Sequence, residues 1–161
     1  MKYSRFEELP VWQHAIELGV AIYRFTANST FKGRYSLKDQ LERATVSISN
    51  NIAEGFERGT TQELLTFLYI ARGSCGETRS VLCLLERLPG FENFKVEISN
   101  LKSRAEEISR QLRTWADYLQ NSDITGQRYL TSKSKRLSKE AREREEFVKE
   151  LEEVRNRKPS G

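Results

Sequence analysis

Apolar residues between positions 98 and 119 recur at alternating intervals of three and four, and this pattern constrains the fold more than any other feature. The residues that carry it are Ile98, Leu101, Ala105, Ile108, Leu112, Trp115 and Leu119. Such spacing places all of them on one face of a helix, as in helices that pack side by side in left-handed bundles. The sequence therefore predicts a helix over about 94–120 that buries this face against other helices.

Three more helices are predicted upstream. One covers 10–28, because proline at Pro10 is favoured in a first helical turn; its predicted buried stripe is Trp12, Ile16, Gly19, Tyr23 and Thr26, flanked by Ala15 and Ile22. The next covers 36–55, with a buried seam of Leu37, Leu41, Ala44, Ile48 and Ile52. The third covers about 60–88 and is apolar around much of its circumference, which predicts that it is covered on more than one side.

Capping residues support two of these helix starts. Thr60 with Glu63 has the spacing of a capping box. Ser36 with Asp39 has the same spacing, although aspartate replaces the preferred glutamate or glutamine. Pro89–Gly90 ends the helix that begins at Thr60.

Four helices with short connections predict an all-α fold, an antiparallel up-down-up-down four-helix bundle. No segment alternates with a period of two, so no sheet is predicted. The bundle is expected over residues 1–121, followed by a charged C-terminal extension over residues 122–161. The extension has strong helix formers but only a thin apolar stripe, so we expect it to be helical against a partner or otherwise disordered.

Composition bounds the chemistry. Apolar residues make up 37% of the chain, without a run near the roughly 18 residues of a membrane span, and the first ten residues lack a secretory signal, so a cytoplasmic location is predicted. Cys75 and Cys83 lie eight residues apart on one predicted helix, about 12 Å, which is too far for a disulfide. With His14 as the single histidine, no usual zinc site can be built. We expect no metal and no cofactor.

Positive charge is unevenly distributed. Residues 1–121 carry 16 basic and 15 acidic side chains, whereas residues 122–161 carry 11 and 8. The bundle alone is therefore nearly neutral, and strong binding of a polyanion to it requires several copies that combine their basic surfaces.

A polar stripe follows the buried seam of the helix predicted over 36–55. Its members are Gln40, Arg43, Ser47, Asn51, Glu54 and Arg58, one residue before the seam, or about 100° around the helix. One interpretation is a solvated face. The interpretation that we favour is a surface that meets another subunit or a nucleic acid.

Gly73 and Gly76 lie inside a predicted helix, where each costs about 0.8–1 kcal/mol relative to alanine. Close approach of another backbone explains this cost. We expect that backbone to be another helix of the same bundle; contact with a second subunit is the alternative, in which Arg72 and Glu77 reach past the glycines to the partner.

Three separated motifs resemble a known family. They are FEELPVWQHAIEL at 6–18, QLERATVSISNNIAEGFER at 40–58 and ARGSCGE at 71–77. In this order they are similar to the bacterial four-helix-bundle proteins, also called the 23S ribosomal-RNA intervening-sequence proteins, over about residues 3–120. The chain departs from the family at Ser49, where many members have proline, and in its longer extension.

The resemblance implies a non-enzymatic oligomeric adaptor. Similar proteins form closed homo-oligomers, with pentamers recurring, and a distant relative is the accessory variability determinant protein of diversity-generating retroelements, a basic pentamer that binds nucleic acid and a reverse transcriptase. We therefore expect a homopentamer that binds RNA or single-stranded DNA, with a reverse transcriptase as a further partner. The residues expected at the nucleic-acid or subunit interface are Lys38, Arg43, Asn51, Glu54, Arg58, Arg72 and Glu77.

Two alternatives stay open. The first is a protein–protein interaction scaffold without a direct nucleic-acid role. The second is a nuclease that uses Glu54 or Glu77. The sequence argues against an enzyme, because it has no paired histidines, no glycine-rich phosphate loop after a strand and no Glu-x-x-His pairs on facing helices.

Overall fold

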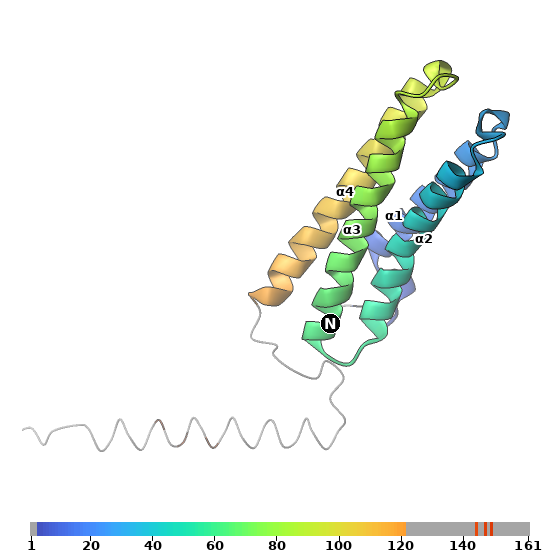
Figure 1. The fold of residues 1–161 in the computed structure, drawn as a ribbon. Coiled ribbons are helices and arrows are strands. Elements are labelled where there is room, and N and C mark those ends of the chain that lie inside the picture. Colours follow the sequence, from blue (N-terminus) through green and yellow to red (C-terminus); the bar gives the residue numbers. More distant parts are fainter. Residues whose placement is uncertain (1–2, 122–143, 145–146, 148, 150–161) are drawn as a thin grey trace, which may run out of the picture. The chain divides into compact units, whose positions relative to one another are not determined.

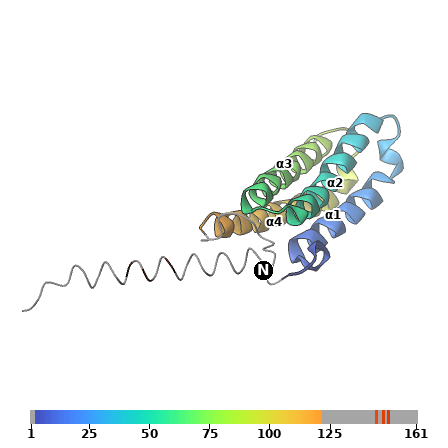
Figure 2. The same cartoon turned by 90° about the horizontal axis from the view of Figure 1, so that it is seen from below.

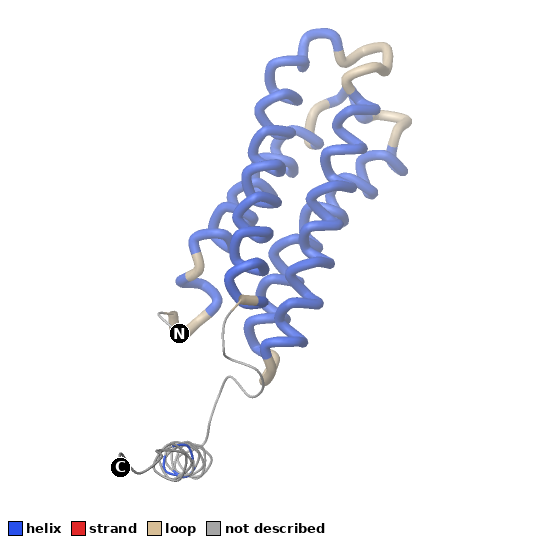
Figure 3. The backbone as a smooth tube through the Cα atoms, turned by 90° about the vertical axis from the view of Figure 1, so that its left-hand side faces the viewer, coloured by secondary structure: helices blue, strands red, loops and turns tan. Residues whose placement is uncertain are grey.

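The computed structural model of the protein describes residues 3–121 and, within the C-terminal extension, residues 144, 147 and 149. Residues 3–121 form four long helices: α1 (Pro10–Thr26), α2 (Tyr35–Glu57), α3 (Thr61–Leu85) and α4 (Lys95–Gln120). Short 3-10 turns lie before α1, before α2 and before α4: η1 (Phe6–Glu8), η2 (Ser29–Phe31) and η3 (Glu92–Phe94). Over the described residues Figure 3 shows helices and loops without a strand, which confirms the all-α prediction.

The four helices lie side by side as an up-down-up-down bundle (Figure 1). Each of α1 and α3 packs against both α2 and α4, and Figure 2 shows the same arrangement from below. All four helices belong to one compact unit. The boundary predicted between residues 121 and 122 stays a prediction, because most of the extension lies outside the described residues. Arg144, Phe147 and Lys149 are helical and exposed.

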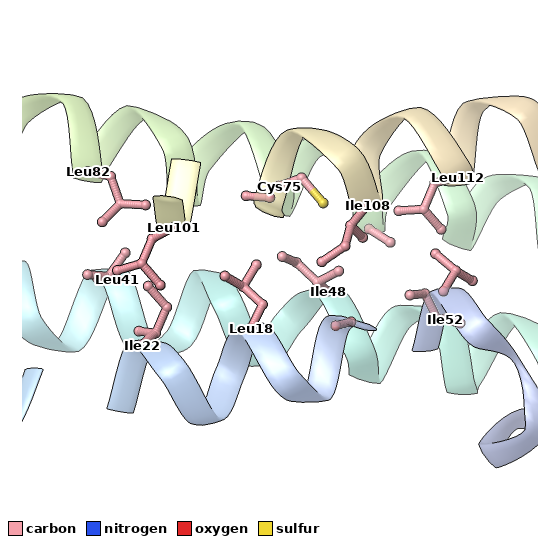
Figure 4. Packing of buried hydrophobic residues seen from close by; sticks show 14 of the residues in the cluster. Leu18, Ile22, Leu41, Ile48, Ile52, Cys75, Leu82, Leu101, Ile108 and Leu112 are labelled. Atoms are coloured by element: carbon pink, nitrogen blue, oxygen red, sulfur yellow. The ribbon is translucent and has the colours of Figure 1, made fainter. Parts of the chain in front are cut away.

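The core contains the predicted seams of α2 and α4. In α4 every seam residue from Ile98 to Leu119 is buried except Trp115, which is half-buried; in α2 all are buried except the half-buried Leu37. Figure 4 shows Leu41, Ile48 and Ile52 directed into the space between the helices. Each fully buried Leu or Ile contributes about 1.5–3 kcal/mol, so these two seams are a major part of the stability of the bundle.

The predicted buried stripe of α1 is displaced by one residue over most of its length, although Thr26 and the flanking Ala15 and Ile22 are buried. The buried residues are Val11, Ala15, Leu18, Ile22, Phe25 and Thr26, whereas Ile16 is 39% and Tyr23 50% exposed. The two stripes have the same spacing of four, three, four and three, but they are rotated by about 100° about the helix axis. Contacts with α2 and α4 select the stripe that contains Leu18 and Ile22, and they leave Ile16 and Tyr23 on the surface.

One of the two predicted capping boxes forms. Thr60 Oγ1 accepts a hydrogen bond of 3.2 Å from the backbone N–H of Glu63, and it donates to the Glu63 carboxylate at 2.7 Å. The box at Ser36 is wrong, because α2 already begins at Tyr35, with Arg34 at the N-cap and no side-chain cap. α3 ends at Leu85, three residues before the predicted end.

An aromatic cluster closes the end of the bundle where the α1–α2 and α3–α4 connections meet. Phe25 and Phe91 each lie 5.2 Å from the ring of Phe31, and Phe94 lies 5.8 Å from Phe25. Arg34 links the two connections, because its guanidinium donates hydrogen bonds to the carbonyls of Thr30 and Pro89 at 2.9 and 2.8 Å. The cluster therefore fixes both loops relative to the helices.

Candidate functional site

The polar stripe of α2 lies partly along the contact between α2 and α3. The hydroxyls of Ser47 and Ser74 are 2.9 Å apart, and Gln40 donates to the carboxylate of Glu77. Asn51 donates from Nδ2 to the carbonyl and hydroxyl oxygens of Ser47 at 2.7 and 3.0 Å. Gln40 and Ser47 therefore join two helices of one chain, whereas Asn51 bonds within α2. For Gln40 and Ser47 this explanation differs from both a solvated face and a contact with another molecule.

Small residues in the contact between α2 and α3 allow the two helices to approach each other closely. Thr45 and Thr78 are fully buried, with hydroxyls 3.4 Å apart. Further along, Gly55 faces Phe67 so closely that a Cβ atom on the glycine would lie 2.7 Å from the Phe67 Cβ. Gly55, which lies in the motif at 40–58, is thus needed for the packing of α3 on α2.

The predicted basic residues of α2 and of its C-cap each pair with an acidic residue four positions away. Lys38 lies 3.7 Å from Glu42, and Arg43 lies 3.5 Å from Asp39. Arg58 pairs with Glu54 and lies over the ring of Phe67 at 5.1 Å. Arg43 nevertheless stays 74% exposed at its side chain, so a phosphate can compete for it.

Arg72 lies apart from those cations. Its guanidinium is 5.7 Å from the ring centre of Tyr69, whose hydroxyl accepts a hydrogen bond from Gln120 of α4. Its Nε atom is buried and has no hydrogen-bond partner among the described residues. The predicted site residues therefore occupy at least two sides of the bundle and do not form one compact site.

An apolar groove of about 580 Å³ runs between α1 and α2, and we call it the α1/α2 groove. Its α1 wall includes Ile16, Gly19, Val20 and Tyr23, and its α2 wall includes Val46 and Asn50. Val20 is 47% exposed, so the wall is accessible to a partner. A second hollow of about 420 Å³ shares Tyr23, Val46 and Asn50 with the groove and extends to Arg43, Ser47 and Asn51. The groove thus continues onto the outer surface of α2, where the polar stripe begins.

The sequence prediction missed this groove because it assigned Ile16 and Tyr23 to the core. A signal was present: α1 has apolar residues on two adjacent stripes, more than one buried face requires. An excess of apolar residues around the helix predicted over 60–88 led to the expectation that other elements cover that helix on more than one side.

The expectation for the mid-helix glycines is also wrong. Gly73 and Gly76 are exposed, and a Cβ atom on either would find no atom within 4 Å. No helix of the same bundle therefore approaches them. The alternative explanation, contact with a second subunit, stays a prediction.

The described residues offer few side chains for metal binding or for acid–base and nucleophilic chemistry. They contain no group of three or more His, Cys, Asp or Glu side chains placed to hold a metal ion. His14 interacts with the amide of Gln111 at 3.1–3.2 Å, beside a small polar hollow lined by Glu17, Arg104 and Glu107. Burial raises the pKa of the Cys75 thiol to about 12, so this thiol stays protonated at neutral pH.

No helix within residues 3–121 has both the length and the apolar character that crossing a bilayer demands.

Comparison with known proteins identifies a family for this chain. No curated protein sequence is significantly similar to this chain. The sequence model of the 23S rRNA-intervening sequence protein family matches residues 7–114. This range contains α1, α2, α3 and most of α4, together with nearly all of the three motifs that suggested the resemblance. The chain therefore belongs to the 23S rRNA-intervening sequence protein family.

Proposed function

We propose that this protein is a non-enzymatic adaptor that self-assembles into a closed ring, a pentamer by the family resemblance, and binds RNA or single-stranded DNA in the cytoplasm. The observation that carries the proposal is the uncovered α1/α2 groove beside the polar stripe of α2. A solvated helix face does not require the apolar side chains that line it.

Self-association accounts for the exposed apolar side chains. Ile16, Val20 and Tyr23 are 39–50% exposed along one groove. Contiguous apolar patches of this kind on a soluble domain mark interaction sites, and covering them yields about 25 cal/mol for each Å² of apolar surface removed from water. Assembly therefore stabilises a surface that is unfavourable in a single chain.

Assembly also supports nucleic-acid binding. A single bundle has a net charge of only +1 over residues 1–121, so it attracts a polyanion weakly. Several copies would place Lys38, Arg43, Arg58 and Arg72 of each chain on one particle, and clustering raises the local potential. The 122–161 extension adds a net charge of +3 for each chain.

The assembly is tested by light scattering at low micromolar concentration. We expect a particle several times heavier than the 18.7 kDa chain. A mass of one chain at all concentrations rejects the ring.

Binding is tested separately with labelled RNA and single-stranded DNA at about 50 mM salt, where phosphate contacts are strong. In the double variant Arg43→Ala/Arg58→Ala, the slope of log affinity against log salt should fall by about 0.7 for each phosphate of a single strand that these arginines neutralise. Matched controls are Asp39→Ala and Glu54→Ala, which free the two arginines from their partners and should strengthen binding. If the assembled protein binds neither RNA nor single-stranded DNA, the proposal of nucleic-acid binding is rejected.

The second candidate is a protein–protein scaffold without a nucleic-acid role. The ion pairs of Lys38, Arg43 and Arg58 favour it, because they reduce the cationic surface of the bundle. A reverse transcriptase is the partner that the retroelement resemblance suggests. Capture of a reverse transcriptase encoded by a neighbouring gene, abolished by deletion of residues 122–161 while assembly persists, would select this candidate and assign the extension as the docking segment.

A further inference from the structure

The outer face of α3 has an unusual composition for a face in water. Residues at steps of four, three, four, three and four lie along it: Thr66, Ile70, Gly73, Glu77, Ser80 and Leu84. All six are exposed, and we call them the outer stripe of α3. Only Glu77 is charged, in a chain with 31% charged residues, whereas the solvent face of a helix is normally polar and charged.

The outer stripe also has apolar and small residues that the bundle does not use. Ile70 is 46% and Leu84 45% exposed. Between them lies Gly73, which weakens the helix by about 0.8–1 kcal/mol relative to alanine and has open space above it. Open space over a glycine between two apolar side chains lets another element approach the α3 backbone.

The α1/α2 groove complements this stripe in shape and charge. Gly19 also carries no side chain and has nothing within 4 Å of its Cβ position, so the groove has depth between Ile16 and Val20. Arg24 lines the groove, and Arg43 lines the adjoining hollow. Arg24 is exposed, and the acid that the outer stripe supplies is Glu77, whose carboxylate accepts a hydrogen bond from Gln40 of the same chain.

We infer that the outer stripe of α3 in one copy docks into the α1/α2 groove of the next copy. The inference rests on the self-assembly proposed above and identifies the two surfaces that meet. Ile70 and Leu84 enter the apolar groove, Gly73 allows the helices to approach, and Glu77 faces the arginine side of the groove. Because stripe and groove are different surfaces, the contact is head-to-tail, which produces a closed ring or an open filament and not an isolated symmetric dimer.

Two charge-introducing variants test the inference. Val20→Glu blocks the groove and Ile70→Glu blocks the stripe; both positions are about half exposed, so the fold should persist by circular dichroism. Each variant alone should sediment as a single chain of 18.7 kDa. A matched control is Val96→Glu on α4. Val96 is 75% exposed and lies outside both surfaces, so this variant should assemble like the unmodified protein.

Mixing the two variants gives the decisive result. Each Val20→Glu chain keeps a working stripe and each Ile70→Glu chain keeps a working groove, so a 1:1 mixture should form dimers with twice the mass of one chain and no larger particle. If only one variant disrupts assembly, like surfaces meet and the inference is overturned. If both variants still assemble, other surfaces are used; self-assembly then stands and the inference falls. If the unmodified protein is itself a monomer, the proposed assembly fails first.

Discussion

A Cβ atom added to Gly55 would lie 2.7 Å from the Cβ of Phe67, closer than two such atoms approach in folded proteins. The side chain and carbonyl of Leu64 lie at 3.2 and 3.4 Å from the same position. Neither the Phe67 Cβ nor a carbonyl is the free end of a flexible side chain. The contact therefore sets how closely α2 and α3 pack at this end of the bundle.

Gly55→Ala should destabilise the protein. Alanine favours the helix by about 0.8–1 kcal/mol over glycine, but overpacking costs about 1–3 kcal/mol, so we expect a net loss of about 1 kcal/mol in the free energy of unfolding by denaturant titration. Gly76→Ala is the matched control, because open space surrounds that position, and it should stabilise the bundle. Equal gains in both variants would show that the α2–α3 contact is not tight.

Removal of the α3 cap should cost stability. Thr60→Ala deletes the acceptor for the Glu63 N–H and the donor to its carboxylate, and we expect a loss of about 1 kcal/mol in thermal or denaturant unfolding. Ser36→Ala also removes a hydroxyl, at a position inside α2 that makes no cap. A loss of similar size at Ser36 would contradict the helix start at Tyr35.

The parts of the fold that followed from sequence are those with one apolar stripe for each helix. α4 and α2 each offer a single seam. The seam residues from Leu41 to Ile52 are accordingly buried, as are those from Ile98 to Leu119 apart from the half-buried Trp115. α1 offers two seams of equal spacing, and spacing alone cannot choose between Leu18 and Ile16. Only the positions of α2 and α4 decide, and these depend on the whole fold.

Side-chain partners were harder to predict than faces. The polar line of Gln40, Ser47 and Asn51 was identified, but the α3 partners of Gln40 and Ser47, which are Glu77 and Ser74, lie 37 and 27 residues away in the sequence. Gly73 was expected under another helix and is in fact open to solvent. A single sequence shows that a residue is unusual for its position, whereas the element that faces it is set by tertiary packing.

Arg34 should be important for closing the aromatic end of the bundle. Its two terminal nitrogens donate to different loops, and its guanidinium lies 5.3 Å from the ring centre of Phe91. Lysine keeps the charge but lacks the planar fork, so Arg34→Lys should lower the free energy of unfolding by about 1–2 kcal/mol. Lys32→Ala, an exposed change in the same connection, should stay within about 0.5 kcal/mol. An equally small effect at Arg34 would mean that the loops are held by the phenylalanines alone.

The two cysteines should differ in reactivity. Cys75 is fully buried and burial raises the pKa of its thiol to about 12, whereas Cys83 is half-buried. Since the thiolate is the reactive form, an alkylating reagent at neutral pH should modify Cys83 first and Cys75 only after unfolding, as peptide mass spectrometry would show. Equal rates at both positions in the folded protein would place Cys75 at the surface.

The raised pKa of Cys75 also predicts how stability changes in alkaline solution. Below the ordinary value of 9.0 the thiol is protonated in both the folded and the unfolded chain, so the full contribution is present. Between 9.0 and about 12 the unfolded chain loses this proton while the folded chain keeps it. The free energy of unfolding should therefore fall with rising pH, by up to about 1.4 kcal/mol for each pH unit from this group.

Cys75→Ala should be less stable at neutral pH because it leaves a cavity, but its stability should decline less steeply above pH 9.0. Parallel alkaline slopes for the two proteins in denaturant titrations would show that Cys75 ionises equally in both states.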